Sequence, residues 1–84
     1  MGFIRDVKAQ AIGKEAEKAY ANGDWYFTPM LNLPQSKPNM SGNIPDWGMM
    51  IGAIVNAGWN LQHWTVGQDK HGKPEAYPVF VRRS

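Results

Sequence analysis

The spacing of apolar positions predicts a helix at the start of the chain. Charged residues such as Lys14 and Glu17 alternate with these positions and suit a face exposed to water. Asn22-Gly23 follows, and glycine often ends a helix because it readily adopts the left-handed conformation. We therefore expect residues 1–22 to form an N-terminal helix. The apolar positions at helical spacing are Phe3, Ile4, Val7, Ala11, Ala19 and Tyr20.

A second helix is expected to begin near Pro45, after a loop at residues 34–43 that is rich in proline, serine and asparagine. Proline suits the first turn of a helix, and Asp46 complements the positive end of the helix dipole. We expect Gly58 to end this helix. The predicted buried stripe comprises Trp47, Met50, Ile51, Ile54 and Val55.

Three segments have the aromatic and β-branched content of strands. Residues 24–33 form the first, although Pro29 interrupts it. Residues 59–66 and 75–82 form the second and third, joined by a polar turn. The order α-β-α-β-β predicts an α+β fold in which residues 24–83 are a β-α-β-β unit with a three-stranded sheet.

Proline guides the predicted strand order, because a residue without a backbone N–H is confined to edge strands or bulges. The first strand carries Pro29 and the third carries Pro78, so the second strand is predicted to lie in the centre, in the order 1-2-3. The first strand would then run parallel to it through a right-handed crossover. The alternative is a split arrangement with the third strand in the centre, which needs a bulge at Pro78. Both arrangements place the helices on one face of the sheet.

Composition restricts the class of protein. A chain of 84 residues is expected to form a single domain, and without cysteine it has no disulfide and no cysteine-bound zinc. Its net charge of +2 reflects few charged residues slightly out of balance. The N-terminus meets charge too early for a signal peptide, and the most apolar stretch, residues 47–55, is far shorter than the ~20 residues of a membrane span. We therefore predict a cytoplasmic protein without a membrane partner.

An exposed apolar surface is predicted on the uncovered face of the sheet. Trp64 and Val66 fall on the opposite side of their strand from Trp59, so they are expected to face away from the helices. Trp25 and Tyr26 are predicted at the rim of the same surface. Such a patch is typical of a protein-binding or self-association surface. The sequence therefore predicts a non-enzymatic module that binds an unidentified protein.

Two glycines on the second helix leave self-association open. Gly48 and Gly52 are four residues apart, a pattern that lets another backbone approach closely. We favour close packing of the helix on its own sheet. The alternative is a homodimer interface.

Nucleic-acid binding is the alternative function. Sheet tryptophans would stack on bases, and Lys70, Lys73, Arg82 and Arg83 would contact phosphates of a single strand. Asp69 and Glu75 dilute this charge. Protein binding is therefore favoured.

No arrangement of residues predicts catalysis, a metal site or a cofactor. The spacing of His63 and His71, with Asp69 and Glu75 nearby, matches no established ligand pattern. The serines lie in a loop or at the terminus and have no oriented base beside them. We therefore predict no catalytic residues, no metal and no cofactor.

The C-terminal half resembles a known group of sequences. Gly58-Trp59-Asn60-Leu61, followed by a hairpin ending at residues 80–83, resembles small bacterial domains of unknown function in which Gly-Trp-x-Leu opens a strand. The whole chain resembles short proteins of actinobacteria and their phages. The resemblance implies no catalytic or ligand residues; a phage origin would imply a host protein as the partner whose activity is altered. The matching runs are Phe3-Ile4-Arg5-Asp6, Phe27-Thr28-Pro29, His63-Trp64 and Pro74-Glu75-Ala76-Tyr77-Pro78.

Overall fold

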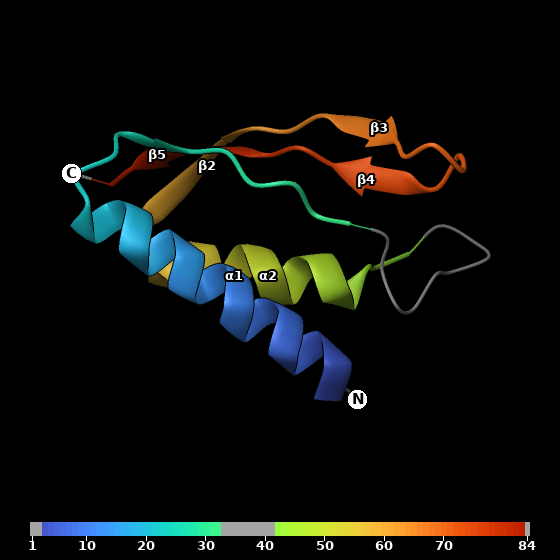
Figure 1. Ribbon diagram of the computed structural model, residues 1–84, viewed down its shortest axis with the longest axis horizontal. Helices are drawn as coiled ribbons and strands as arrows, with labels where there is room; N and C mark the ends of the chain where they lie inside the picture. The colour runs from blue at the N-terminus through green and yellow to red at the C-terminus, as the bar shows by residue number, and fades with distance from the viewer. Residues whose placement is uncertain (1–2, 33–41, 84) are drawn as a thin grey trace.

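The computed structural model describes residues 3–32 and 42–83, with side chains from residue 7 onward in the first helix. Its elements confirm the α+β class, and each strand of the predicted hairpin is divided in two (Figure 1). Most of the predicted loop at residues 34–43 lies outside the described residues. The helices are α1 (Phe3–Ala21) and α2 (Pro45–Asn56), and the strands are β1 (Tyr26–Phe27), β2 (Trp59–His63), β3 (Val66–Gln68), β4 (Pro74–Ala76) and β5 (Val79–Arg82).

The central strand of the three-stranded sheet is β5, which pairs antiparallel with β1 on one side and with β2 on the other. β3 and β4 form a second antiparallel pair, and a bridge between Leu31 and Ala76 continues the β1 side alongside β4. The predicted order 1-2-3 is therefore wrong. The split arrangement, with the third predicted strand in the centre, is the observed one, but the register shift lies between Leu61 and His63 in β2 rather than at Pro78.

The predicted strand order is wrong because Pro29 and Pro78 lie opposite each other. The pairing of Phe27 with Phe80 and the bridge at Leu31 share one register. This register places Pro29 opposite Pro78, at a position where each residue of an antiparallel pair would donate to the other. Both missing donors therefore fall at a single interruption of the ladder, and a proline-bearing strand can occupy the centre.

A register shift in β2 turns the side chains that follow it to the other face. The shift lies between Leu61 and His63 and adds one residue to the alternation of sides. Trp64 consequently lies on the helix side, where its ring centroid is 5.6 Å from that of Trp47 in α2. Val66 pairs with a buried residue of β4. The prediction that Trp64 and Val66 face the uncovered side is therefore wrong.

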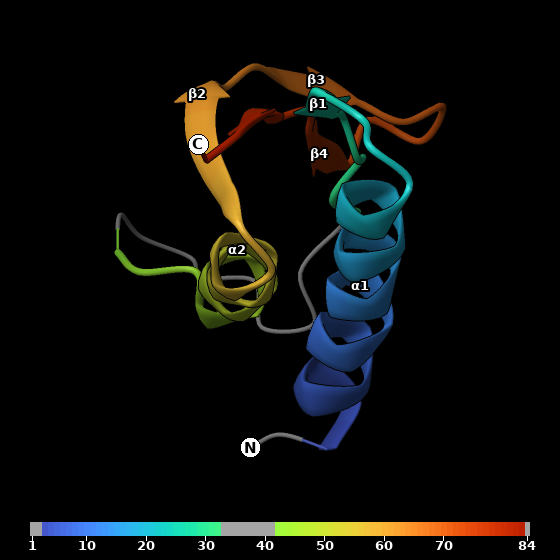
Figure 2. The same ribbon diagram turned by 90° about the vertical axis from the view of Figure 1, so that its left-hand side faces the viewer.

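Both helices lie side by side on one face of the sheet, as predicted (Figure 2). Small residues bring them together: a Cβ at Gly13 would lie 3.3 Å from the Cβ of Ala53. Ala16 is fully buried. Val7 and Ala11, two of the apolar positions at helical spacing, are exposed, because Gly13 and Ala16 form the contact with α2. The predicted positions before residue 7 lie outside the described side chains.

The first helix ends at Asn22-Gly23, as predicted. Gly23 has a φ of 89°, and its N–H donates to the carbonyl of Tyr20 at 3.1 Å. The N–H of Asp24 donates to the carbonyl of Ala19, also at 3.1 Å. These two bonds form the Schellman arrangement that closes many helices.

The second helix confirms its predicted bounds, and of the predicted stripe Trp47, Met50 and Ile54 are buried while Ile51 and Val55 are partly buried. It begins at Pro45 and ends before Gly58, whose φ is 111°. A Cβ at Gly58 would lie 2.6 Å from the ring of Tyr20, so both conformation and space require glycine. Gly48 and Gly52 are exposed, and among the described residues nothing packs within 4 Å of a Cβ placed at either. The prediction that they allow close packing on the sheet is therefore wrong.

Among the described residues, Trp59, the first residue of β2, lies in one of the two buried clusters of the core. Its side chain is fully buried, and its Nε1–H donates to the carbonyl of Ala16 at 3.0 Å. The rings of Tyr20 and Phe27 lie 5.8 and 5.7 Å from it, between centroids. Phe80 of β5 is buried in the same cluster. Trp59 therefore joins α1, β1 and β5.

Candidate functional site

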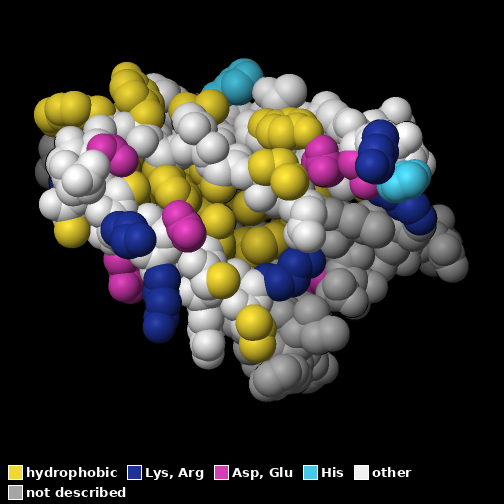
Figure 3. Space-filling model, in the orientation of Figure 1, with side chains coloured by type: hydrophobic (Ala, Val, Ile, Leu, Met, Phe, Trp, Pro, Cys, Tyr) yellow, Lys and Arg dark blue, Asp and Glu magenta, His cyan; other side chains and the backbone are white. Residues whose placement is uncertain are grey.

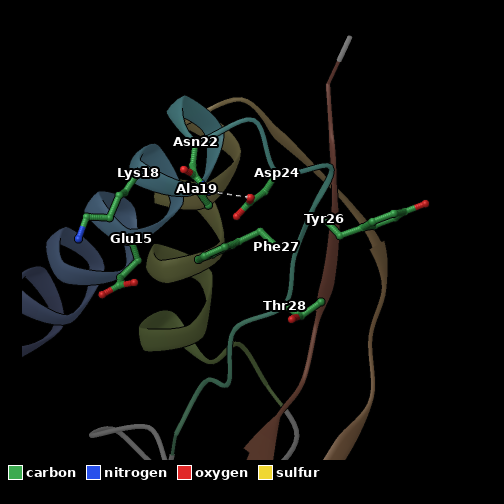
Figure 4. A pocket seen from close by; sticks show the side chains of 8 residues that line it. All are labelled: Glu15, Lys18, Ala19, Asn22, Asp24, Tyr26, Phe27 and Thr28. Atoms are coloured by element: carbon green, nitrogen blue, oxygen red, sulfur yellow. Dashed lines mark hydrogen bonds between the residues drawn. The ribbon is translucent and has the colours of Figure 1, made fainter.

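A groove runs between α1 and the segment that follows it, residues 24–32. Its larger compartment, of about 680 Å³, lies between the last turns of α1 and β1 (Figure 4). Figure 3 shows this face of the molecule, with apolar side chains gathered in a hollow above α1. The residues that line the compartment are Glu15, Lys18, Ala19, Asn22, Asp24, Tyr26, Phe27 and Thr28.

A second compartment continues the groove toward the N-terminus of α1. It has a volume of about 330 Å³ and shares Glu15 with the first. We refer to both compartments together as the α1–β1 groove. Its floor is apolar in both parts, with Ala19 and Phe27 in one and Ile12 and Met30 in the other. The residues that line the second compartment are Lys8, Ala11, Ile12, Glu15, Met30, Asn32 and Met50.

The strand side of the groove is anchored at both ends. At one end, the N–H of Arg82 donates to the carbonyl of Trp25 at 2.9 Å. At the other, Trp47 Nε1–H donates to the carbonyl of Asn32 at 2.8 Å. The groove therefore has a defined wall.

Large apolar side chains are exposed on the segment that forms this wall. The exposed fractions are 64% for Trp25, 57% for Tyr26 and 48% for Met30. Figure 4 shows Phe27 pointing toward the helices and Tyr26 pointing away from them. Tyr26 nevertheless lines the groove, so its backbone borders it.

The helix side of the groove carries charges of both signs. Lys8, Glu15 and Lys18 alternate along α1. The carboxylate of Asp24, on the opposite wall, accepts a hydrogen bond from the side-chain amide of Asn22 at 3.1 Å. This wall therefore offers no continuous positive track for a phosphate backbone.

The four residues predicted to bind a partner lie on two separate edges. Trp25 and Tyr26 are exposed at the β1 edge. Trp64 and Val66 are 36% and 53% exposed on the opposite side of β5, where the chain passes from β2 into β3. The predicted residues therefore do not form one surface.

The basic residues proposed for nucleic-acid binding are also divided. Lys70 and Lys73 lie in the turn between β3 and β4, at the opposite end of the molecule from Arg82 and Arg83 (Figure 1). The guanidinium of Arg82 lies 3.9 Å from the centroid of the Tyr20 ring. Both arginines donate to main-chain carbonyls at the ends of the helices: Arg82 to those of Tyr20 and Asp24, and Arg83 to that of Val55. The arginines therefore complement the negative ends of the helix dipoles.

The polar residues of the hairpin have local roles. The carboxylate of Asp69 accepts from the N–H groups of His71 and Lys73 at 2.8 and 2.9 Å and so shapes the turn. The hydroxyl of Tyr77 donates to the Glu75 carboxylate at 2.5 Å, and this bond raises the pKa of Tyr77 above its ordinary value. In the described ranges, no three histidine, aspartate or glutamate side chains gather as metal ligands would.

Sequence reasoning missed the groove residues Ile12, Glu15, Phe27 and Met30. The sequence predicts Phe27 and Met30 in the same strand, but nothing in it indicates that α1 leaves space next to them. The signal that could have found the groove is the alanine and glycine content of α1, since these residues cannot fill the space between a helix and a strand.

Neither described helix has the length and apolar character to span a membrane. No protein-family model, no curated protein and no solved structure matches the chain.

Proposed function

We propose that the chain is a non-enzymatic protein-interaction module that binds its partner at the α1–β1 groove. The observation that carries this proposal is an open groove with an apolar floor beside exposed aromatic side chains. In this proposal the partner acts in the cytoplasm and covers this surface. If the resemblance to phage proteins holds, the partner is a host protein.

The residue types at the groove support binding to protein. Trp25, Tyr26 and Met30 are of the kinds enriched at protein interfaces, and all are about half exposed or more. Covering apolar surface contributes roughly 25 cal/mol per Å², so a few such side chains can anchor a partner. The second patch, at Trp64 and Val66, has fewer supporting features because Trp64 already packs on Trp47.

The alternative, single-stranded nucleic-acid binding, has less support. Arg82 and Arg83 are engaged with main-chain carbonyls, and Lys70 and Lys73 lie in the turn of the separate β3–β4 pair. A strand of nucleic acid would have no contiguous basic path between them.

Affinity capture with matched variants tests the proposal. The tagged wild type, a Trp25→Ala/Tyr26→Ala double variant and a Leu61→Ala control would be incubated with nuclease-treated lysate. Leu61 is 44% exposed on the opposite edge, so the control removes an exposed apolar side chain elsewhere. The proposal predicts one protein captured by the wild type and the control, and lost with the double variant. Capture unaffected by the double variant, or no capture by any form, would contradict it.

A further inference from the structure

We propose that the partner presents an extended peptide segment, which adds to the sheet as a strand along the open edge of β1 and places apolar side chains in the α1–β1 groove. This inference rests on the proposed function and names the form of its partner. Three features of the groove support it: the hydrogen-bonding edge, the position of Pro29 and the dimensions and charge of the cleft.

The first feature is the edge itself. β1 stands at the end of the sheet order, and within the described ranges only β5 and the bridge to β4 pair with this segment. Arg82 N–H donates to the carbonyl of Trp25, so Tyr26 and Val81 form a pair that is not hydrogen-bonded. The N–H and C=O of Tyr26 therefore point away from β5, toward the open edge.

The second feature is the position of the proline. At Leu31, N–H and C=O both bond to Ala76, at 2.8 and 2.9 Å. Phe27 and Leu31 pair in one register, and the backbone groups of successive residues point to alternate edges of the strand. The N–H and C=O groups of Thr28 and Met30 therefore point toward the open edge. Pro29 falls on the inner side. The open edge thus keeps its N–H groups at every second residue, which is what an added strand requires.

The third feature is the match in size and charge. From Lys8 to Asn22, the α1 wall is about 21 Å long at 1.5 Å per residue, the length of about six extended residues. The apolar floor accepts apolar side chains at alternate positions of such a segment. Charges of both signs on the wall favour a segment of low net charge. A peptide of this kind fits better than a helix, which offers no backbone donors to a strand edge.

The test uses random octapeptides displayed on phage and selected against the full chain, followed by synthetic copies of one selected peptide. N-methylation of alternate amides should lower affinity about tenfold in one register and leave it within about twofold in the other, because only one register donates to β1. Failure to select any peptide, or equal sensitivity of both registers, would overturn the inference.

A matched pair of variants locates the binding. Ala11 and Gln10 are both exposed on α1, but only Ala11 lines the groove on the β1 side. Ala11→Glu should weaken the peptide about tenfold, since a carboxylate would be desolvated in the cleft, whereas Gln10→Glu should change affinity less than about twofold. Equal effects of the two variants would overturn the inference.

Sedimentation of the chain alone tests whether a second copy of the chain occupies the β1 edge. A concentration-dependent dimer that the peptide dissociates would mean that a second copy occupies the β1 edge, which would overturn the assignment to a partner's segment. Capture of a partner that depends on Trp25 and Tyr26, without any peptide binding, would leave the proposed function standing while this inference fails.

Discussion

The two sides of the sheet are closed by their helices to different degrees. Beneath β2, Ile54 of α2 and Tyr20 of α1 pack in the cluster that buries Trp59 completely. Beneath β1, α1 lines the groove with two alanines, Ile12 and charged side chains, while Gly13 and Ala16 form its close approach to α2. The side chains that bring two helices together therefore cannot also fill the gap between a helix and a strand, and that gap is the α1–β1 groove.

The largest expected effect lies on the closed side, at Trp59. Trp59→Ala removes a fully buried ring and its hydrogen bond to Ala16, so we expect a loss of about 3–5 kcal/mol in the free energy of unfolding. Trp59→Phe, which keeps an aromatic ring but loses the donor, should cost about 1–2 kcal/mol. Urea unfolding followed by circular dichroism measures both. Equal stability of Trp59→Ala and wild type would show that Trp59 is not part of the core.

A pair of glycines gives the next effect. Gly58→Ala should cost about 2–4 kcal/mol, because alanine is strained at a φ of 111° and its Cβ would clash with Tyr20. Gly48→Ala, on the open surface of α2, should instead stabilise the protein by about 0.5–1 kcal/mol. Thermal melts of both variants measure the difference. Destabilisation by Gly48→Ala would indicate that something packs on that face, such as a second copy.

The next largest effect on stability is expected at Arg82, which joins the ends of the helices. Arg82→Met removes donors to the carbonyls of Tyr20 and Asp24, and we expect a loss of about 1–3 kcal/mol in stability. Lys70→Met, in the exposed turn, should change stability by less than about 0.5 kcal/mol. If both substitutions were neutral for folding but abolished nucleic-acid binding, the alternative function would be favoured.

The open side should tolerate an added side chain. Ala11→Leu is expected to change the free energy of unfolding by less than about 0.5 kcal/mol, since Ala11 is exposed beside the groove. Ala16→Leu, between the helices, should cost about 1–3 kcal/mol through overpacking. Denaturant unfolding compares them. Similar costs would mean that the groove is as tightly packed as the helix contact.

The smallest effect concerns Tyr77, whose hydroxyl donates to Glu75. This bond favours the protonated phenol and raises the pKa of Tyr77, so its contribution to stability is present below the ordinary pKa of 10.0 and is lost as pH rises through the folded value. Glu75→Gln should lower the pKa of Tyr77. NMR titration of labelled tyrosine rings measures it, with Tyr26 as the internal reference. An unchanged titration of Tyr77 would show that the bond does not form in solution.

Local signals predicted most of the helical structure, whereas pairing between distant segments did not follow from them. Pro45 and Gly58 mark the start and the end of α2, as predicted, because each acts through its own backbone conformation. The predicted strand order was wrong because each proline was considered separately. The missing N–H donors of Pro29 and Pro78 fall at one interruption of the ladder only because the two residues lie opposite each other. The predicted face of Trp64 was wrong because one extra residue in β2 reverses the alternation of side chains between the two faces.

The candidate site was predicted only in part, for a similar reason. Trp25 and Tyr26 are exposed, as expected of binding residues, but the groove beside them is a space between two elements. Such a space depends on which face α1 turns toward α2, and small residues leave little hydrophobic signal from which to read that face.

Hydrogen exchange of individual amides, with and without a selected peptide or captured partner, tests the central claim most directly. The account predicts slower exchange at the amides of Tyr26, Thr28 and Met30 on binding, with no change at Leu61 on the opposite edge. Protection at Leu61, or none along the β1 edge, would contradict it.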